Sequence, residues 1–206
     1  MPNKITATYR IVTPMFIGDA KQEANGISPN SVKGALRFWW RALNWGKFLK
    51  KAENEADALR QLHKREVELF GGLPETVKNE QTGKTETTGG QGAFLLRVVQ
   101  NIETKDILDK GSLDKTFNLK ENPWQSYLMG LGLMQYDKDK KQNFYQRSAI
   151  VNGSFTVKIY CKPCSSDPSK KREQLKQLSE LKNLLLIWGL LGGLGSRQRK
   201  GLGGIM

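Results

Sequence analysis

The sequence has 206 residues, of which 38% are hydrophobic and 26% charged, and this predicts a soluble globular protein of one domain or slightly more. It contains no stretch of about 18 apolar residues and no apolar N-terminal segment, so we expect neither a membrane span nor a signal peptide. Two cysteines exclude a disulfide framework and predict a cytoplasmic location. A single histidine excludes most catalytic-triad and metal-catalysis schemes.

The charge balance indicates an anionic partner. The formal net charge is +13 and the pI is about 9.8, values most often found in nucleic-acid-binding proteins and less often in membrane-surface proteins. Three windows contain no acidic residue: 24–52 with six Lys and Arg, 140–166 with five, and 181–206 with four. The alternative is an ordinary solubility surface, but three basic windows without acids favour binding.

The first part of the chain predicts a strand, a loop and a helix. Residues 4–12 alternate as in a half-buried strand, and residues 13–28 contain the Gly, Pro and Asn residues typical of a loop. Either Ser28-Pro29 or Asn30-Ser31 can begin the helix, because Ser and Asn side chains accept the free backbone N–H groups of a first turn. The helical spacing of apolar residues predicts a buried stripe made of Val32, Leu36, Trp39 and Leu43.

The middle of the chain predicts a second helix from about residue 52 to residue 70, ended by Gly71 and the residues after it. Residues 75–92 are almost entirely polar, so we expect an exposed loop there. Residues 93–100 predict a strand, and residues 101–122 are polar and mixed.

The last part predicts one more strand and the longest helix. We expect a short helix or turn at 124–136, a charged loop at 137–147, a strand at 152–161 and a helix at 168–191. A glycine-rich loop follows, and another strand would begin near Gly204.

This order of elements predicts an α+β, ferredoxin-like (RRM-like) βαββαβ domain with helical and loop insertions. The last strand is expected to be incomplete, because a strand usually runs about 5 residues or more and the sequence ends soon after Gly204. We therefore expect a sheet edge that is exposed or filled by another chain. Either a second chain completes the sheet, or the sequence is the front piece of a longer protein.

The first helix places Lys33, Arg37 and Arg41 on one face, at spacings of four residues. Trp40 lies beside that face. Lys and Arg side chains next to an aromatic ring suit single-stranded RNA, because the positive side chains bind phosphates and the ring stacks on a nucleobase. The alternative is an amphipathic helix with solvated bases and a buried Trp40.

The glycine-rich run near the end of the sequence is a candidate anion-binding loop. Glycines permit positive φ angles and close approach of backbone to a ligand. The run lacks the Gly-Lys-Ser/Thr ending of a P-loop. The alternative is a flexible tail. The candidate RNA-binding residues of this run are Gly193, Gly195, Arg197, Arg199, Lys200, Gly201 and Gly203. We expect its three basic side chains to line one groove with Lys33, Arg37 and Arg41.

Five segments resemble motifs of the RAMP superfamily, the RNA-binding proteins of CRISPR effector complexes. The two Gly-x-Gly pairs within 193–203 resemble its signature loop, Ser31 to Arg37 its first-helix motif, and Leu69-Phe70-Gly71 its Leu-Phe-Gly element. Within the superfamily, Thr13 to Gly18 and LRFWWRAL at 36–43 resemble the first-subunit family of the type III-B (Cmr) RNA-targeting complex. Tyr127 to Gly130 is compatible with that family.

The resemblance implies a single RAMP or ferredoxin-like domain over 1–206, without the second domain that the family usually carries. It implies a non-catalytic, RNA-binding subunit at one end of the complex, near the 3′ end of the guide RNA. The implied partners are guide RNA, target RNA and other RAMP subunits. No cofactor, metal, membrane or enzymatic activity is expected.

Two other functions stay open. A guide-processing ribonuclease of the same superfamily would use His63 with Lys or Tyr residues, although His63 lies in a polar segment without a second histidine. A general single-stranded RNA-binding module would bind RNA without other CRISPR subunits. Cys161 and Cys164 form a C-x-x-C pair, which we interpret as two thiols because a structural zinc needs four ligands.

Overall fold

The computed structural model describes residues 4–18, 21, 23–78, 85–110, 112–113, 124, 127, 133–139, 141–162 and 167–206. The chain divides into two units, each described by itself. The first unit comprises Met1–Thr6, Lys33–Arg97 and Lys158–Leu185, and the second comprises Ala7–Val32, Val98–Val157 and Leu186–Met206.

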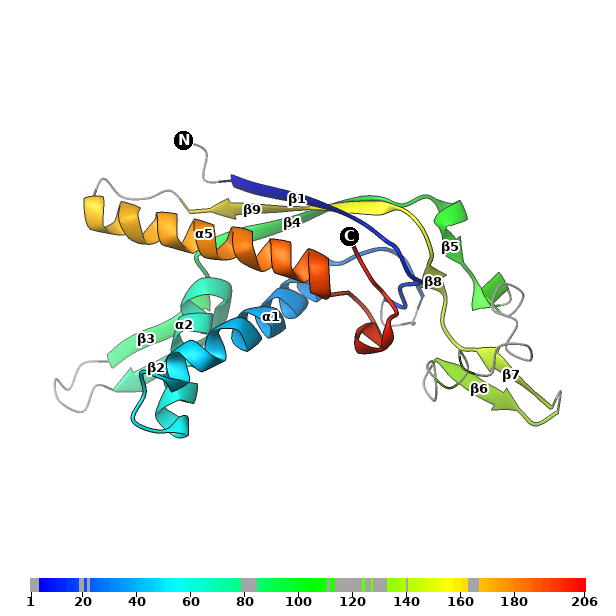
Figure 1. Ribbon diagram of the computed structural model, residues 1–206, viewed down its shortest axis with the longest axis horizontal. Coiled ribbons are helices and arrows are strands. Elements are labelled where there is room, and N and C mark those ends of the chain that lie inside the picture. The colour runs from blue at the N-terminus through cyan, green and yellow to red at the C-terminus, as the bar shows by residue number, and fades with distance from the viewer. Residues whose placement is uncertain are drawn as a thin grey trace. The chain divides into compact units, whose positions relative to one another are not determined.

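Three strands form the central sheet, in the order β1-β9-β4 (Figure 1). They are β1 (Lys4–Arg10), β9 (Ser154–Cys161) and β4 (Phe94–Asn101), close to the predicted ranges. More buried and more exposed residues alternate along most of each strand, so that one face of the sheet is buried and the other faces outward. The buried residues of the strands are Ile5, Tyr9, Phe94, Phe155, Val157 and Ile159.

The helices agree with the sequence prediction at most of their ends. They are α1 (Pro29–Leu49), α2 (Glu55–Phe70) and α5 (Pro168–Leu191). The Asn54 side chain accepts a hydrogen bond from the Asp57 N–H at 2.9 Å and caps α2, which ends where Gly71 adopts a φ of 83°. Trp188 of α5 packs edge-on against Tyr9 and Phe155, with ring centroids at 4.9 and 6.1 Å, so α5 covers the buried face of the sheet there.

Two hairpins replace segments predicted as loops (Figure 1). Within the segment 75–92 predicted as an exposed loop, β2 (Gly71–Lys78) pairs antiparallel with β3 (Thr85–Gln91), whereas 79–84 lie outside the described residues. Likewise β6 (Met134–Asp137) pairs with β7 (Gln142–Tyr145) in the region predicted as a charged loop and at the end of the predicted helix or turn. Hydrogen bonds between backbone N–H and C=O groups hold a hairpin together, and the hydropathy pattern of the side chains does not reveal them. The rest of the segment predicted at 124–136 lies mostly outside the described residues.

The second unit has its own hydrophobic cluster beside a short ladder. Strand β5 (Ile107–Leu108), which follows the 3-10 helix η1 (Thr104–Asp106), pairs with β8 (Ala149–Ile150). Met15 then bridges Ile150, and Phe16 bridges Ser196. The cluster comprises Phe16, Leu113, Leu133, Tyr145 and Ala149, with Leu108 and Leu202 packed against it.

The final residues lie along β1. Ile205 forms an antiparallel bridge with Ile11, and Arg10 and Met206 exchange two backbone hydrogen bonds of 2.7 and 3.0 Å. Strand-like pairing thus begins near Gly204, as predicted. That another chain extends or fills this edge stays a prediction. In the described part of the chain, none of the helices is both long and apolar enough to cross a membrane.

Candidate functional site

The glycine loop, residues 193–204, is anchored to residues 13–16 by its backbone. Gly203 N–H donates to the Pro14 carbonyl and Ser196 N–H to the Phe16 carbonyl, both at 2.8 Å. Gly204 N–H donates to Thr13 Oγ1 at 2.7 Å. The loop is therefore a fixed element and not the flexible tail that was the alternative.

The glycines of this loop serve mainly to let the chain approach itself. A Cβ atom at Gly203 would lie 1.9 Å from the Leu194 carbonyl oxygen, and one at Gly195 would lie 2.7 Å from the Phe16 carbonyl oxygen. Both glycines have positive φ angles, 62° and 92°. Gly193 also meets this loop's own backbone. Of the predicted ligand-binding glycines, Gly201 has open space around its Cβ position.

The basic residues occupy the tip of the loop. The 3-10 helix η2 (Gln198–Lys200) is preceded by Arg197, which adopts the left-handed conformation at φ 62° and ψ 21°. Lys200 N–H donates to the Arg197 carbonyl at 2.7 Å and closes the turn. Arg199 and Lys200 are exposed and Arg197 is half-buried. A non-glycine residue held at positive φ stores strain of about 1 kcal/mol or more, which often marks a functional turn.

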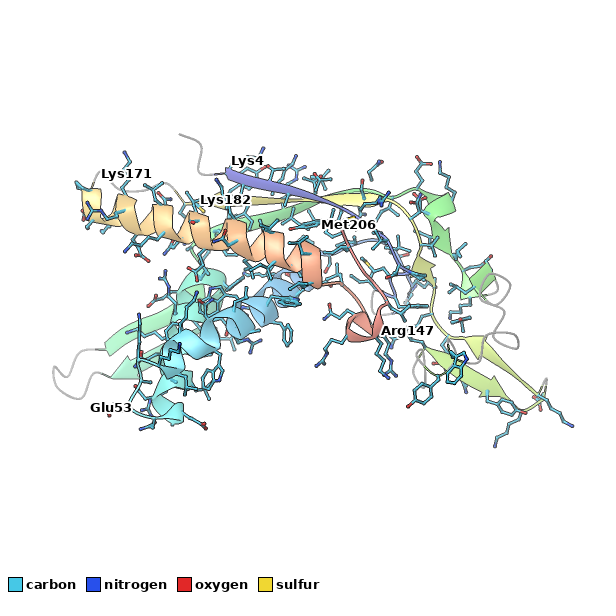
Figure 2. The ribbon with its side chains drawn as sticks, in the orientation of Figure 1. Lys4, Glu53, Arg147, Lys171, Lys182 and Met206 are labelled. Carbon is cyan, nitrogen blue, oxygen red and sulfur yellow. The ribbon has the colours of Figure 1, made fainter. Side chains whose placement is uncertain are left out.

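A fourth base, Arg147, joins this tip and was not singled out from the sequence. Its guanidinium donates to Ser196 Oγ at 3.1 Å, and Figure 2 shows Arg147 beside the end of the glycine loop. The available signal was the acid-free window 140–166, which contains Arg147. The loop therefore gathers four basic side chains from segments far apart in the sequence.

The basic face of α1 is partly neutralised by a buried carboxylate. Glu66 of α2 lies 3.4 Å from Arg37 Nε and 3.5 Å from Arg41 Nε. Arg37 also donates to the Gly71 carbonyl and lies over the Phe70 ring. Arg37 thus joins α1 to α2, and 31% of its side chain is exposed. The predicted role as a phosphate ligand fits Arg41 better, because 52% of its side chain is exposed.

Lys33 begins the same face and is half-buried. Burial lowers the pKa of its ammonium group, and the nearby Arg37 charge lowers this pKa further. The signal for the missed Glu66 was its position between Leu62 and Leu69, at spacings of four and three residues on the buried side of α2.

Trp40 is buried, so the prediction that it stacks on RNA is wrong. Its exposure is 1%, and its indole N–H donates to Glu180 Oε1 at 2.6 Å. The buried stripe of α1 runs through Val32, Leu36, Trp40 and Asn44, and not through Trp39 and Leu43. The segment Leu36 to Trp40 is apolar except for Arg37, so it leaves the helix phase ambiguous.

The two predicted basic elements fall in different units. Lys33, Arg37 and Arg41 belong to the first unit and the glycine loop to the second, and that they line one groove stays a prediction. His63 is exposed on α2. Cys161 is half-buried, and burial raises its thiol pKa, whereas Cys164 lies outside the described residues. Among the described residues, no group of three His, Cys, Asp or Glu side chains could hold a metal ion.

The sequence similarity to known proteins extends over both basic elements, α1 and the glycine loop. The family model of the RAMP superfamily matches residues 8–205. A CRISPR system Cmr subunit, Cmr1-2, from Pyrococcus furiosus is 26% identical over 196 residues, which make up 94% of this chain and 89% of that protein. The matched residues include α1, α2 and the glycine loop.

Proposed function

Because the chain belongs to the RAMP superfamily, we propose that it is a non-catalytic, RNA-binding subunit of a type III-B CRISPR effector complex. The similarity to a Cmr subunit over 94% of the chain supports the assignment to this complex. In this role it contacts the 3′ region of the guide RNA, the target RNA or both at one end of the complex. It works with other RAMP subunits in the cytoplasm, in antiviral defence.

The proposed domain is a ferredoxin-like βαββαβ unit covering residues 1–206. The sheet order β1-β9-β4 supports it, because these are the first, third and second strands of such a unit. The antiparallel bridge of Ile205 with Ile11 supports it further, since it brings the last residues beside the first strand.

The observation that carries RNA binding is the anchored tip of the glycine loop. Arg199 and Lys200 extend from a turn whose backbone is fixed to residues 13–16, and Arg147 donates a hydrogen bond to Ser196 of the same loop. A pre-ordered turn loses little conformational entropy when it binds a phosphate. Sequence-independent contacts of this kind suit a protein that must accept any guide or target sequence.

The test is the salt dependence of single-stranded RNA binding. We expect Arg199→Ala with Lys200→Ala to weaken binding at every sequence and to reduce the log–log salt slope by about 0.7 for each lost phosphate contact. Both side chains are exposed, so the melting temperature should change little. The matched control is Lys170→Ala with Lys171→Ala, which removes the same charge from exposed positions of α5. An unchanged affinity and slope, in the free chain and in the assembled complex, would refute the proposal.

The non-catalytic role is tested separately with labelled guide precursor and labelled target. We expect no cleavage of either RNA by the purified chain, with or without divalent metal. Cleavage that persists through repurification and disappears in His63→Ala would instead establish the guide-processing ribonuclease.

A further inference from the structure

The exposed face of the central sheet carries Lys and Arg side chains and no acidic ones. The sequences of β1, β4 and β9 contain no Asp or Glu. Since Trp188 packs on the buried face through Tyr9 and Phe155, the alternate residues of each strand point to the opposite, exposed face. Those in the first unit are Lys4, Thr6, Leu95, Arg97, Lys158 and Tyr160, of which only Lys158 is half-buried and the rest are exposed.

An aromatic ring and apolar surface lie among these bases. Tyr160 is 37% exposed and Leu95 is 55% exposed. The Lys4 ammonium lies over the Tyr160 ring, 5.7 Å from its centroid. When Lys4 moves aside to bind a phosphate, it uncovers this ring face for a nucleobase.

We propose that this sheet face is a second RNA-binding surface and that its ligand is single-stranded RNA. Lys4, Arg97 and Lys158 bind phosphates, and a nucleobase stacks on Tyr160. The inference rests on the proposed RNA-binding function and adds a surface that the glycine loop does not include. The surface is named the sheet platform below.

Two observations favour single-stranded RNA over other occupants. A single strand offers unstacked bases that can lie on an exposed ring, whereas the base faces of a duplex are already covered by their neighbours. The core of a protein–protein interface contains few lysines, whereas here Lys4 lies over the ring and Lys158 is two residues from Tyr160 on the same face of β9.

The experiment compares variants of the full chain in binding a short, fluorescent single-stranded RNA of mixed sequence across a salt series. The charge variant is Lys4→Ala, Arg97→Ala and Lys158→Ala together, and the stacking variant is Tyr160→Ala. The matched control removes three exposed bases from the first turns of α5, by Lys170→Ala, Lys171→Ala and Arg172→Ala. Melting temperatures are measured for all variants.

We expect the charge variant to lower affinity at least about ten-fold at low salt and to reduce the salt slope by roughly 2, while the control changes both much less. Tyr160→Ala should lower affinity about five-fold or more at an unchanged slope. RNA carrying a photoreactive uridine should cross-link to the peptide that contains Tyr160, and this cross-link should disappear in the charge variant.

Three results would overturn the sheet platform while leaving the proposed function intact. The first is normal RNA binding by both platform variants when the Arg199 and Lys200 variant has lost it. The second is an equal loss for duplex RNA, which would show that the face binds phosphates without reading bases. The third is loss of other complex subunits from the charge variant at normal RNA affinity, which would make the face a protein interface. Failure of the unaltered chain and complex to bind RNA would overturn both proposals.

Discussion

Gly203→Ala should destabilise the protein far more than Gly201→Ala, although both glycines have positive φ angles, 62° and 84°. A left-handed conformation costs an L-residue roughly 1–2 kcal/mol. At Gly201 this is the whole cost, because an added Cβ meets nothing within 4 Å.

At Gly203 the added Cβ would lie 1.9 Å from the Leu194 carbonyl oxygen, well inside van der Waals contact. The two backbone segments must separate. This breaks the hydrogen bonds from Leu194 N–H to the Gly203 carbonyl and from Gly203 N–H to the Pro14 carbonyl, both 2.8 Å long. Each is worth about 1 kcal/mol, so the total for Gly203→Ala is about 3–4 kcal/mol.

For a chain of this length, 1 kcal/mol lowers the melting temperature by about 2–4 °C. We therefore expect losses of about 6–16 °C for Gly203→Ala and about 2–8 °C for Gly201→Ala, measured by calorimetry. Hydrogen exchange should show the Leu194 and Gly203 amides losing protection in Gly203→Ala and keeping it in Gly201→Ala. Equal melting temperatures for the two variants would refute the close backbone approach on which this expectation depends.

Other predictions concern buried polar groups. Glu66→Ala should cost about 2 kcal/mol, between the values for exposed and buried pairs, because its arginine partners are 31% and 52% exposed; a melting temperature within about 2 °C of the parent would contradict the buried network. Trp40→Phe should lower the melting temperature at unchanged RNA affinity, because it removes the hydrogen bond to Glu180 and no stacking surface; the reverse result would restore the stacking role. The Glu103 backbone N–H donates to Asp106 and lowers the pKa of its carboxyl group. This carboxylate therefore stabilises the fold above its unfolded pKa of about 3.9, and the stabilisation is lost as pH falls through the lower folded pKa. Asp106→Asn should accordingly lower stability at pH 7 and flatten the acid limb of a stability–pH curve below about pH 4.

Elements defined by local signals were predictable from the sequence. The start of α5 at Pro168 agrees with the prediction, because a fixed φ acts within one turn. The predicted start of α2 near residue 52 was about one turn early, because the Asn54 cap places it at Glu55. The alternation of β1 and β9 likewise reports a sheet with one buried face. The β2–β3 hairpin was missed because its backbone pairing, from Gly71 opposite Gln91 outward, leaves no hydrophobic pattern.

The candidate site was predictable in its composition and less so in its geometry. The bases of the glycine loop stand at its tip, as their position between two glycine pairs indicated. Why position 195 requires a glycine could not be predicted, because the backbone that Gly195 approaches belongs to Phe16, far away in the sequence. The same holds for Arg37, whose partner Glu66 is supplied by the next helix.

The pairing of residues 10–16 with residues 193–206 has a consequence for synthesis on the ribosome. Phe16 bonds to Ser196, and Arg10 to Met206, so about 180 residues or more must be translated before either contact can form. At roughly 5–20 residues per second, the early segment waits on the order of ten seconds or longer for its partners. During that time Met15 and Phe16, both buried in the finished fold, remain available to a chaperone or to aggregation. Productive folding of the second unit is therefore expected to follow, and not accompany, the synthesis of the glycine loop.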